Sequence, residues 1–126
     1  MGMSSKLKIL IIEDEAINAL LISNQLKRLG YEVCRLASTG DDAINIFKEE
    51  QPDFLLIDIG LAGQMDGIET AKRISEIRKV PFAFLTGYAS DTISRRVAGM
   101  TPVAYLTKPI QFGQIEALLQ SILPKS

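Results

Sequence analysis

Residues 53–59 read DFLLIDI, a short apolar run that reaches a carboxylate at its sixth position. Successive side chains of a strand point to opposite faces, so both faces of this run are apolar. That pattern is typical of a central strand in a parallel sheet, which is covered by helices on both sides. Residues 53–59 therefore predict the centre of a parallel sheet.

Short apolar runs alternate with segments of helical period along the whole chain. The expected strands cover residues 7–12, 31–37, 53–59, 80–86 and 103–106. The expected helices cover 16–29, 39–50 and 111–123, together with one that Asp66 caps and a short one that Ser90 caps. This alternation predicts an α/β fold with right-handed crossovers and helices on both faces of a parallel sheet. In such a sheet, the ligand site lies beyond the carboxyl ends of the strands.

Length and composition indicate one globular domain. The chain has 126 residues, of which 47% are hydrophobic and 23% are charged. That length is sufficient to bury a core without disulfides or structural metals. No stretch has the composition of a linker, so we expect one domain over residues 7–123, an N-terminal extension over residues 1–6, and no output domain.

Charge and residue content exclude several functional classes. The net charge is −1, which gives no sign of a nucleic-acid surface, and no apolar run approaches the roughly 20 residues of a membrane span. Residues 1–6 lack a secretory signal, so a cytoplasmic protein is expected. Cys34 is the only cysteine and is interpreted as a small buried hydrophobe. Because the chain has no histidine, any phosphoryl or metal chemistry must use carboxylates, lysine, hydroxyls and backbone groups.

Polar residues follow four of the predicted strands. Glu13 and Asp14 come after the first, Asp58 ends the third, Thr86 ends the fourth, and Lys108 follows the fifth. Taken singly, each has an ordinary explanation as a helix cap, turn residue or solvated side chain. Together they predict an oxygen-only site, which selects a hard ion such as Mg²⁺ before Ca²⁺. At such a site the Asp58 carboxylate could attack phosphorus in line while Lys108 and Thr86 bind the phosphoryl oxygens.

These residues lie within longer motifs. The motifs are IIEDE at 11–15, LLIDI at 55–59, MDGIE at 65–69, FLTG at 84–87 and AYLTKPI at 104–110. Over roughly residues 7–123 the chain resembles the receiver domain of two-component response regulators, in the variant with a longer loop after the acceptor aspartate. The resemblance implies a flavodoxin-like (βα)5 fold, a doubly wound five-stranded parallel sheet with strand order 2-1-3-4-5.

The resemblance also implies roles for the residues at the strand ends. Asp58 would accept a phosphoryl group from a histidine kinase or a histidine phosphotransfer protein. Asp14, Asp58 and the backbone carbonyl of Gly60 would bind Mg²⁺ directly, and Glu13 would bind it largely through water. Lys108 and Thr86 would contact the phosphoryl group. Such a domain is a signalling switch that takes a phosphoryl group and loses it again, and not a turnover enzyme.

Signalling to a downstream protein is implied in the same way. Thr86 and Tyr105 would rearrange together and alter the face formed by the fourth helix, the fifth strand and the fifth helix, through which a homodimer could also form. The Lys108–Pro109 bond would be cis. Gly60 and Tyr88 occupy positions that control the access of water to the acyl phosphate, so the lifetime of the phosphorylated state stays open.

Three other classes of protein fit these residues less well. A phosphatase of the haloacid-dehalogenase type needs an aspartate two residues after its nucleophile, where this chain has Gly60. A flavodoxin-like FMN protein needs a phosphate loop, but residues 13–15 are acidic and would repel phosphate. A receiver-like binding protein without phosphorylation is disfavoured by the intact Asp58, Thr86 and Lys108. A stand-alone regulator and a receiver cut from a larger protein stay equally open, as do docking and ordinary packing for Ala16 and Ile17.

Overall fold

The computed structural model describes residues 7–87 and 91–122. The strands are β1 (Lys8–Ile12), β2 (Glu32–Val33), β3 (Phe54–Asp58), β4 (Phe82–Thr86) and β5 (Ala104–Thr107). The helices are α1 (Ala16–Arg28), α2 (Gly40–Glu50), α3 (Gly67–Ile77), α4 (Asp91–Arg96) and α5 (Phe112–Ile122). Tyr88 and Ser90, including the predicted cap of the fourth helix, lie outside the described residues.

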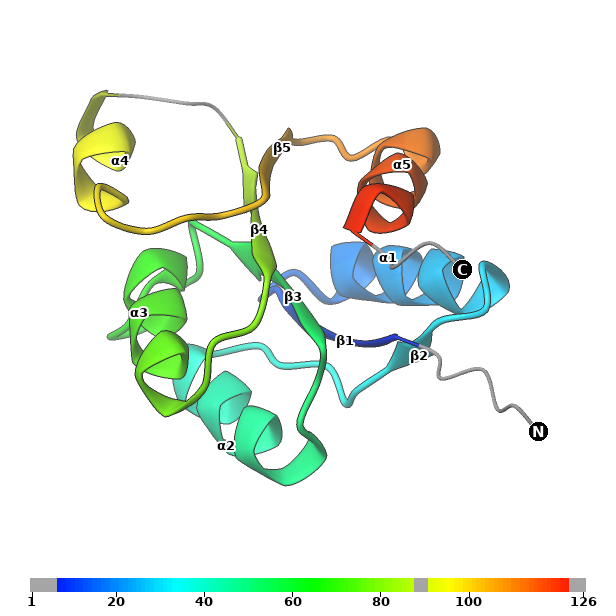
Figure 1. The fold of residues 1–126 in the computed structure, drawn as a ribbon, viewed down its shortest axis with the longest axis horizontal. Coiled ribbons are helices and arrows are strands. Elements are labelled where there is room, and N and C mark those ends of the chain that lie inside the picture. The colour runs from blue at the N-terminus through cyan, green and yellow to red at the C-terminus, as the bar shows by residue number, and fades with distance from the viewer. Residues whose placement is uncertain (1–6, 88–90, 123–126) are drawn as a thin grey trace.

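The strands form one parallel sheet in the order β2-β1-β3-β4-β5 (Figure 1). This is the doubly wound, flavodoxin-like order, so the predicted fold class is confirmed. Helices α1 and α5 cover one face of the sheet, and α2, α3 and α4 lie on the other (Figure 1). The order reverses between β1 and β3, which places the crevice for a ligand at the carboxyl ends of these two strands.

Strand β3 is buried along its whole length, as its apolar sequence predicts. Leu55 and Ile57 pack into the core under α2 and α3, whereas Phe54 and Leu56 pack into the core under α1 and α5. The alternation of strand side chains thus divides one continuous apolar run between two cores. Asp58 ends the run with a carboxylate at the edge of the sheet.

The predicted strand boundaries differ from the structure by one or two residues, and by more at residues 31–37. The predicted strand 31–37 pairs regularly over Glu32 and Val33 alone, and Ala37 adds an isolated bridge to Ile12. Burial along this segment does not alternate, since Cys34 and Ala37, three positions apart, are both buried and Leu36 is exposed. The fifth strand begins at Ala104, one residue later than predicted, because Val103 at its start stays exposed on the edge of the sheet.

Helix α3 begins in direct contact with the end of β3. Its predicted cap is present, since an Asp66 side-chain oxygen accepts a hydrogen bond from the Glu69 backbone N–H at 3.0 Å. Gly67 follows, and a Cβ atom at this position would lie 2.1 Å from the carbonyl oxygen of Asp58. Glycine therefore allows the helix to start against the backbone of Asp58.

Candidate functional site

The structure brings the polar residues at the strand ends to one edge of the sheet. Glu13 and Asp14 directly follow β1, and Asp58 is the last residue of β3. One carboxylate oxygen from each of these three residues lies within 4.8 Å of the others. We call this trio the acidic cluster. Its members follow or end the neighbouring strands β1 and β3. They meet because parallel strands end at the same side of the sheet.

Lys108 is the cation of the site. Its Nζ atom lies 3.2 Å from Asp58 Oδ2 and 3.2 Å from Glu13 Oε1. Burial disfavours the charged form of Lys108 and acts to lower its pKa. The hydrogen bonds and charge contacts of the ammonium with Asp58 and Glu13 outweigh burial, so the pKa of Lys108 lies above its usual value. The Lys108 backbone N–H donates to the Thr86 carbonyl at 2.8 Å, and the Lys108–Pro109 bond is cis, as the resemblance implied.

Glu13 is the most buried carboxylate of the cluster, with 2% of its surface exposed. Its Oε2 atom accepts a hydrogen bond from the Glu15 backbone N–H at 3.1 Å. Its Oε1 atom is buried and has no hydrogen bond of good geometry within the described part of the chain. Burial is the main cause that raises the pKa of Glu13 to about 7. Glu13 Oε1 lies 3.2 Å from the Lys108 ammonium, a charge contact without good hydrogen-bond geometry, so this buried oxygen is suited to a cation. The oxygen-only donor set fits Mg²⁺.

The loop after β3 is attached to the acidic cluster. Asp58 Oδ1 accepts a hydrogen bond from the Gly60 backbone N–H at 3.0 Å, and Asp14 Oδ2 accepts one from the Ala62 N–H at 3.1 Å. These two bonds hold the backbone of residues 60–62 beside the carboxylates. Gly60, the expected carbonyl ligand, therefore lies next to Asp58, which is itself 5% exposed.

Thr86 and Tyr105 lie on neighbouring strands but differ in exposure. Thr86 is buried at the end of β4, at the edge of the sheet that holds the acidic cluster. Tyr105 lies two register positions earlier on β5, opposite Phe84, and its ring centroid is 5.8 Å from that of Phe84. Tyr105 is 46% exposed, so its ring is only partly packed.

Three contacts were not predicted from the sequence. Glu15 Oε1 accepts a hydrogen bond from Asn18 Nδ2 at 2.7 Å and lies 3.8 Å from Lys108 Nζ. The spacing of Glu15 and Asn18 at a helix start is a signal that could have found the first contact. Arg96 of α4 forms an ion pair with both carboxylate oxygens of Asp66, and 30 positions separate the two residues in the chain. No local pattern indicates that pair.

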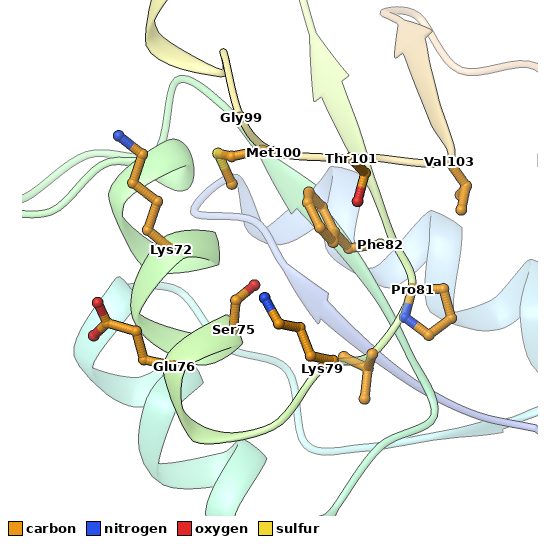
Figure 2. A pocket seen from close by; sticks show the side chains of 11 residues that line it. Lys72, Ser75, Glu76, Lys79, Pro81, Phe82, Gly99, Met100, Thr101 and Val103 are labelled. Carbon is orange, nitrogen blue, oxygen red and sulfur yellow. The ribbon is translucent and has the colours of Figure 1, made fainter.

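One sizeable cavity lies away from the acidic cluster. It has a volume of about 800 Å³ and lies at the amino ends of β4 and β5, with Lys72, Lys79 and Phe82 among its lining residues (Figure 2). A second cavity of about 470 Å³ is lined in part by Glu13 and Lys108 and thus borders the site. The chemistry of the side chains, and not the size of a cavity, therefore locates the site.

A doubly wound sheet with an acidic cluster and a lysine at its switch point defines a class of small α/β domains with a strand-end carboxylate site. Residues 9–120 match the response regulator receiver domain family, and the chain belongs to this family. It is therefore a receiver domain of the two-component signalling type. Among the described residues, no helix has the length and apolar character needed to cross a membrane.

Individual relatives agree with the family assignment. The chain is 34% identical over 121 residues to the alkaline phosphatase synthesis transcriptional regulatory protein PhoP of Bacillus subtilis, covering 94% of this chain and 49% of the relative. The present chain spans about half the length of the curated relatives that it matches.

Two solved structures support the same assignment. The signal receiver domain of a modulated diguanylate cyclase from Desulfovibrio desulfuricans has a TM-score of 0.86 at 30% identity, with 93% of each chain covered. The receiver domain of a sensor histidine kinase from Pseudomonas aeruginosa has a TM-score of 0.80 at 28% identity and covers 93% of this chain and 97% of its own. That structure is described as having a magnesium ion coordinated in its active site cleft.

Glu13 should make the effect of Mg²⁺ on stability depend on pH. Its folded-state pKa of about 7 lies above that of an unfolded glutamate, so the metal-free fold loses stability as the pH rises toward 7 and Glu13 ionises. Mg²⁺ would bind the ionised form and offset this loss. We expect Mg²⁺ to raise Tm more at about pH 8 than at about pH 6. Calorimetric scans at both pH values measure this, and Glu13→Gln should remove the difference; equal shifts for the unsubstituted protein would contradict it.

Proposed function

We propose that Asp58 accepts a phosphoryl group from a histidine kinase or a histidine phosphotransfer protein, in a reaction that requires Mg²⁺. The observation that carries the proposal is the surroundings of Asp58. Its carboxylate ends a buried strand, belongs to the acidic cluster, and lies 3.2 Å from the Lys108 ammonium. A nucleophile beside a fixed cation and a metal-binding set is the arrangement that phosphoryl transfer needs.

The residues of the site divide the chemistry between them. Asp14, Asp58 and the Gly60 carbonyl, with Glu13 behind them, would hold Mg²⁺, which supplies charge neutralisation at the phosphoryl oxygens. An Asp58 oxygen forms the new bond to phosphorus while the bond from phosphorus to the donor imidazole nitrogen breaks. That nitrogen takes up a proton, and the imidazole is the leaving group.

Two further side chains act on the transferred group. The Lys108 ammonium offsets the negative charge of the phosphoryl oxygens. The Thr86 hydroxyl donates a hydrogen bond to one of them. Of the alternatives, the phosphatase mechanism is not favoured, because Gly60 carries no side chain to act as general acid.

A small phosphodonor tests the reaction without a partner protein. Incubation with acetyl phosphate and Mg²⁺ should add one phosphoryl group to the chain, as read by intact mass. The gain should vanish when Mg²⁺ is removed with a chelator. No gain at saturating Mg²⁺ would contradict the proposal.

We infer that the phosphorylated state is signalled through Thr86 and Tyr105 to the face formed by α4, β5 and α5. The buried Thr86 would move toward the phosphoryl group, and the half-exposed Tyr105 would fill the space that it leaves. The downstream partner and a homodimer would both use this face. Hydrogen exchange of residues 104–107 should change on phosphorylation, and Thr86→Ala should remove that change.

The phosphodonor protein would dock on α1. Ile17, Leu20 and Leu21 of this helix are 75%, 53% and 57% exposed, and Leu21 also lines the cavity beside Lys108. This apolar surface adjoins the site and favours docking over the alternative of ordinary packing for Ile17.

Ile17→Asp should separate docking from chemistry. A charge in the apolar docking surface should slow transfer from a phosphorylated histidine phosphotransfer protein by about tenfold or more, since interface anchors commonly contribute above 1 kcal/mol. Phosphorylation by acetyl phosphate should stay unchanged. Ile77→Asp is the matched control, because Ile77 is an exposed isoleucine at the far end of α3. Equal transfer rates for Ile17→Asp and Ile77→Asp would rule out docking at Ile17.

A further inference from the structure

Glu15 is a carboxylate that the acidic cluster does not include. Its side chain is 65% exposed, whereas Glu13 and Asp58 are buried. The Asn18 amide donates to Glu15 Oε1 at 2.7 Å, and the Lys108 ammonium lies 3.8 Å from the same oxygen. Two neighbours therefore fix the Glu15 carboxylate on the outer side of Lys108.

Glu15 gives the entrance of the site an uncompensated negative charge. A divalent cation together with the Lys108 ammonium would balance the three carboxylates of the acidic cluster. The Glu15 carboxylate remains outside this balance, and a phosphoryl group that approaches Asp58 is itself an anion. The Glu15 carboxylate and the phosphoryl group therefore repel each other. Because Glu15 is 65% exposed, this repulsion acts through solvent, and salt screens it.

The space beside Glu15 is where a donor would approach. The cavity of about 470 Å³ is lined by Glu15, Asn18 and Lys108 together with apolar side chains, among them Leu21 and Ile110. A donor that enters this space meets a carboxylate and an amide at its rim and apolar side chains on its wall. A protein donor can offer a basic or amide side chain to Glu15, which a small free anion cannot.

We propose that Glu15 is a specificity-determining residue of the phosphorylation site. It disfavours small, highly charged phosphodonors and favours a protein donor that carries a cationic or hydrogen-bond-donating side chain beside its phosphohistidine. The inference rests on the proposed function, because it concerns the donor for Asp58. Glu15 acts through its charge at the entrance and takes no part in bond making.

Two small donors of different charge test this inference. At neutral pH acetyl phosphate carries two negative charges, and phosphoramidate carries a net single charge. At low ionic strength Glu15→Gln should speed phosphorylation by acetyl phosphate roughly fivefold and by phosphoramidate roughly twofold. These factors correspond to a separation of roughly 8 Å in water between the Glu15 carboxylate and the phosphoryl group. Glu15→Lys should speed both further. Roughly 0.5 M salt should remove most of the difference between the variants.

Control variants isolate the position of the charge. Glu15→Asp keeps the charge and should behave as the unsubstituted protein does. Glu76→Gln changes the net charge equally but lies near the end of α3, away from the acidic cluster, and should leave both rates unchanged. At roughly 0.5 M salt, where the long-range attraction of Glu15 for the cation is screened, calorimetric titration with Mg²⁺ should give the same affinity for Glu15→Gln and for the unsubstituted protein.

The outcomes separate this inference from the proposed function. If the unsubstituted protein takes no phosphoryl group from either donor, the proposed function fails. If it is phosphorylated but Glu15→Gln speeds both donors equally and independently of salt, Glu15 acts by holding Lys108, and the inference is overturned. Unchanged rates, or an affinity for Mg²⁺ that stays weakened at roughly 0.5 M salt, would overturn it as well.

Discussion

Asp58→Ala should abolish phosphorylation by acetyl phosphate in the presence of Mg²⁺, a loss of at least about a thousandfold in rate. Asp58 is the member of the acidic cluster that ends the central strand and contacts Lys108 at 3.2 Å. Without its carboxylate, no oxygen remains at this position to form the bond to phosphorus. Intact mass spectrometry over a time course measures the loss directly.

The same variant should remain folded. Removing one of several crowded carboxylates relieves repulsion in the metal-free protein, so Tm should be equal to or above that of the unsubstituted chain. Asp41→Ala is the matched control, since it removes an exposed carboxylate from the first turn of α2 and should be phosphorylated normally. Phosphorylation of Asp58→Ala at the rate of Asp41→Ala would refute the assignment of Asp58 as the acceptor.

Gly67→Ala should lower the free energy of unfolding by about 3 kcal/mol, at the upper end of what overpacking costs. The added Cβ would lie 2.1 Å from the Asp58 carbonyl oxygen and 2.8 Å from the carbonyl carbon. Both atoms belong to the backbone of the central strand and cannot move aside as a flexible side chain can. Helix α3 must therefore shift away from β3, and phosphorylation of Asp58 should slow as well.

Gly113→Ala is the matched control for the effect of added bulk. Gly113 lies within α5, and a Cβ there would meet no atom within 4 Å. Alanine should stabilise this position by about 0.5–1 kcal/mol, because it restricts the unfolded chain and favours helix. Urea unfolding of both variants measures the contrast. A Gly67→Ala variant within about 1 kcal/mol of the unsubstituted protein would show that the contact with Asp58 is easily relieved.

Much of the fold follows from local patterns. The run DFLLIDI over residues 53–59 is apolar on both faces, and only a central parallel strand buries both. The predicted edge strand at residues 31–37 was the least accurate, because few partners constrain an edge. Residues 31–37 alternate as a strand does, yet only Glu32 and Val33 pair regularly with β1.

The sequence by itself determined the α/β class, the strand ends, and therefore which carboxylates and which lysine share one edge of the sheet. Periodicity is a local property, and parallel strands always end on the same side. The tertiary structure decided the contacts between elements. It placed Lys108 between Asp58 and Glu13, buried Glu13 Oε1 beside the Lys108 ammonium, and set Glu15 at the entrance.

The pair of Arg96 and Asp66 and the contact of Gly67 with Asp58 were also decided at the tertiary level. Distances of this kind depend on how helices pack against the sheet, and the spacing of residues along a chain does not encode them. Burial has the same origin, and so does the pKa of Glu13 that follows from it. The residues of the site could thus be named from the sequence, whereas their electrostatics required the folded chain.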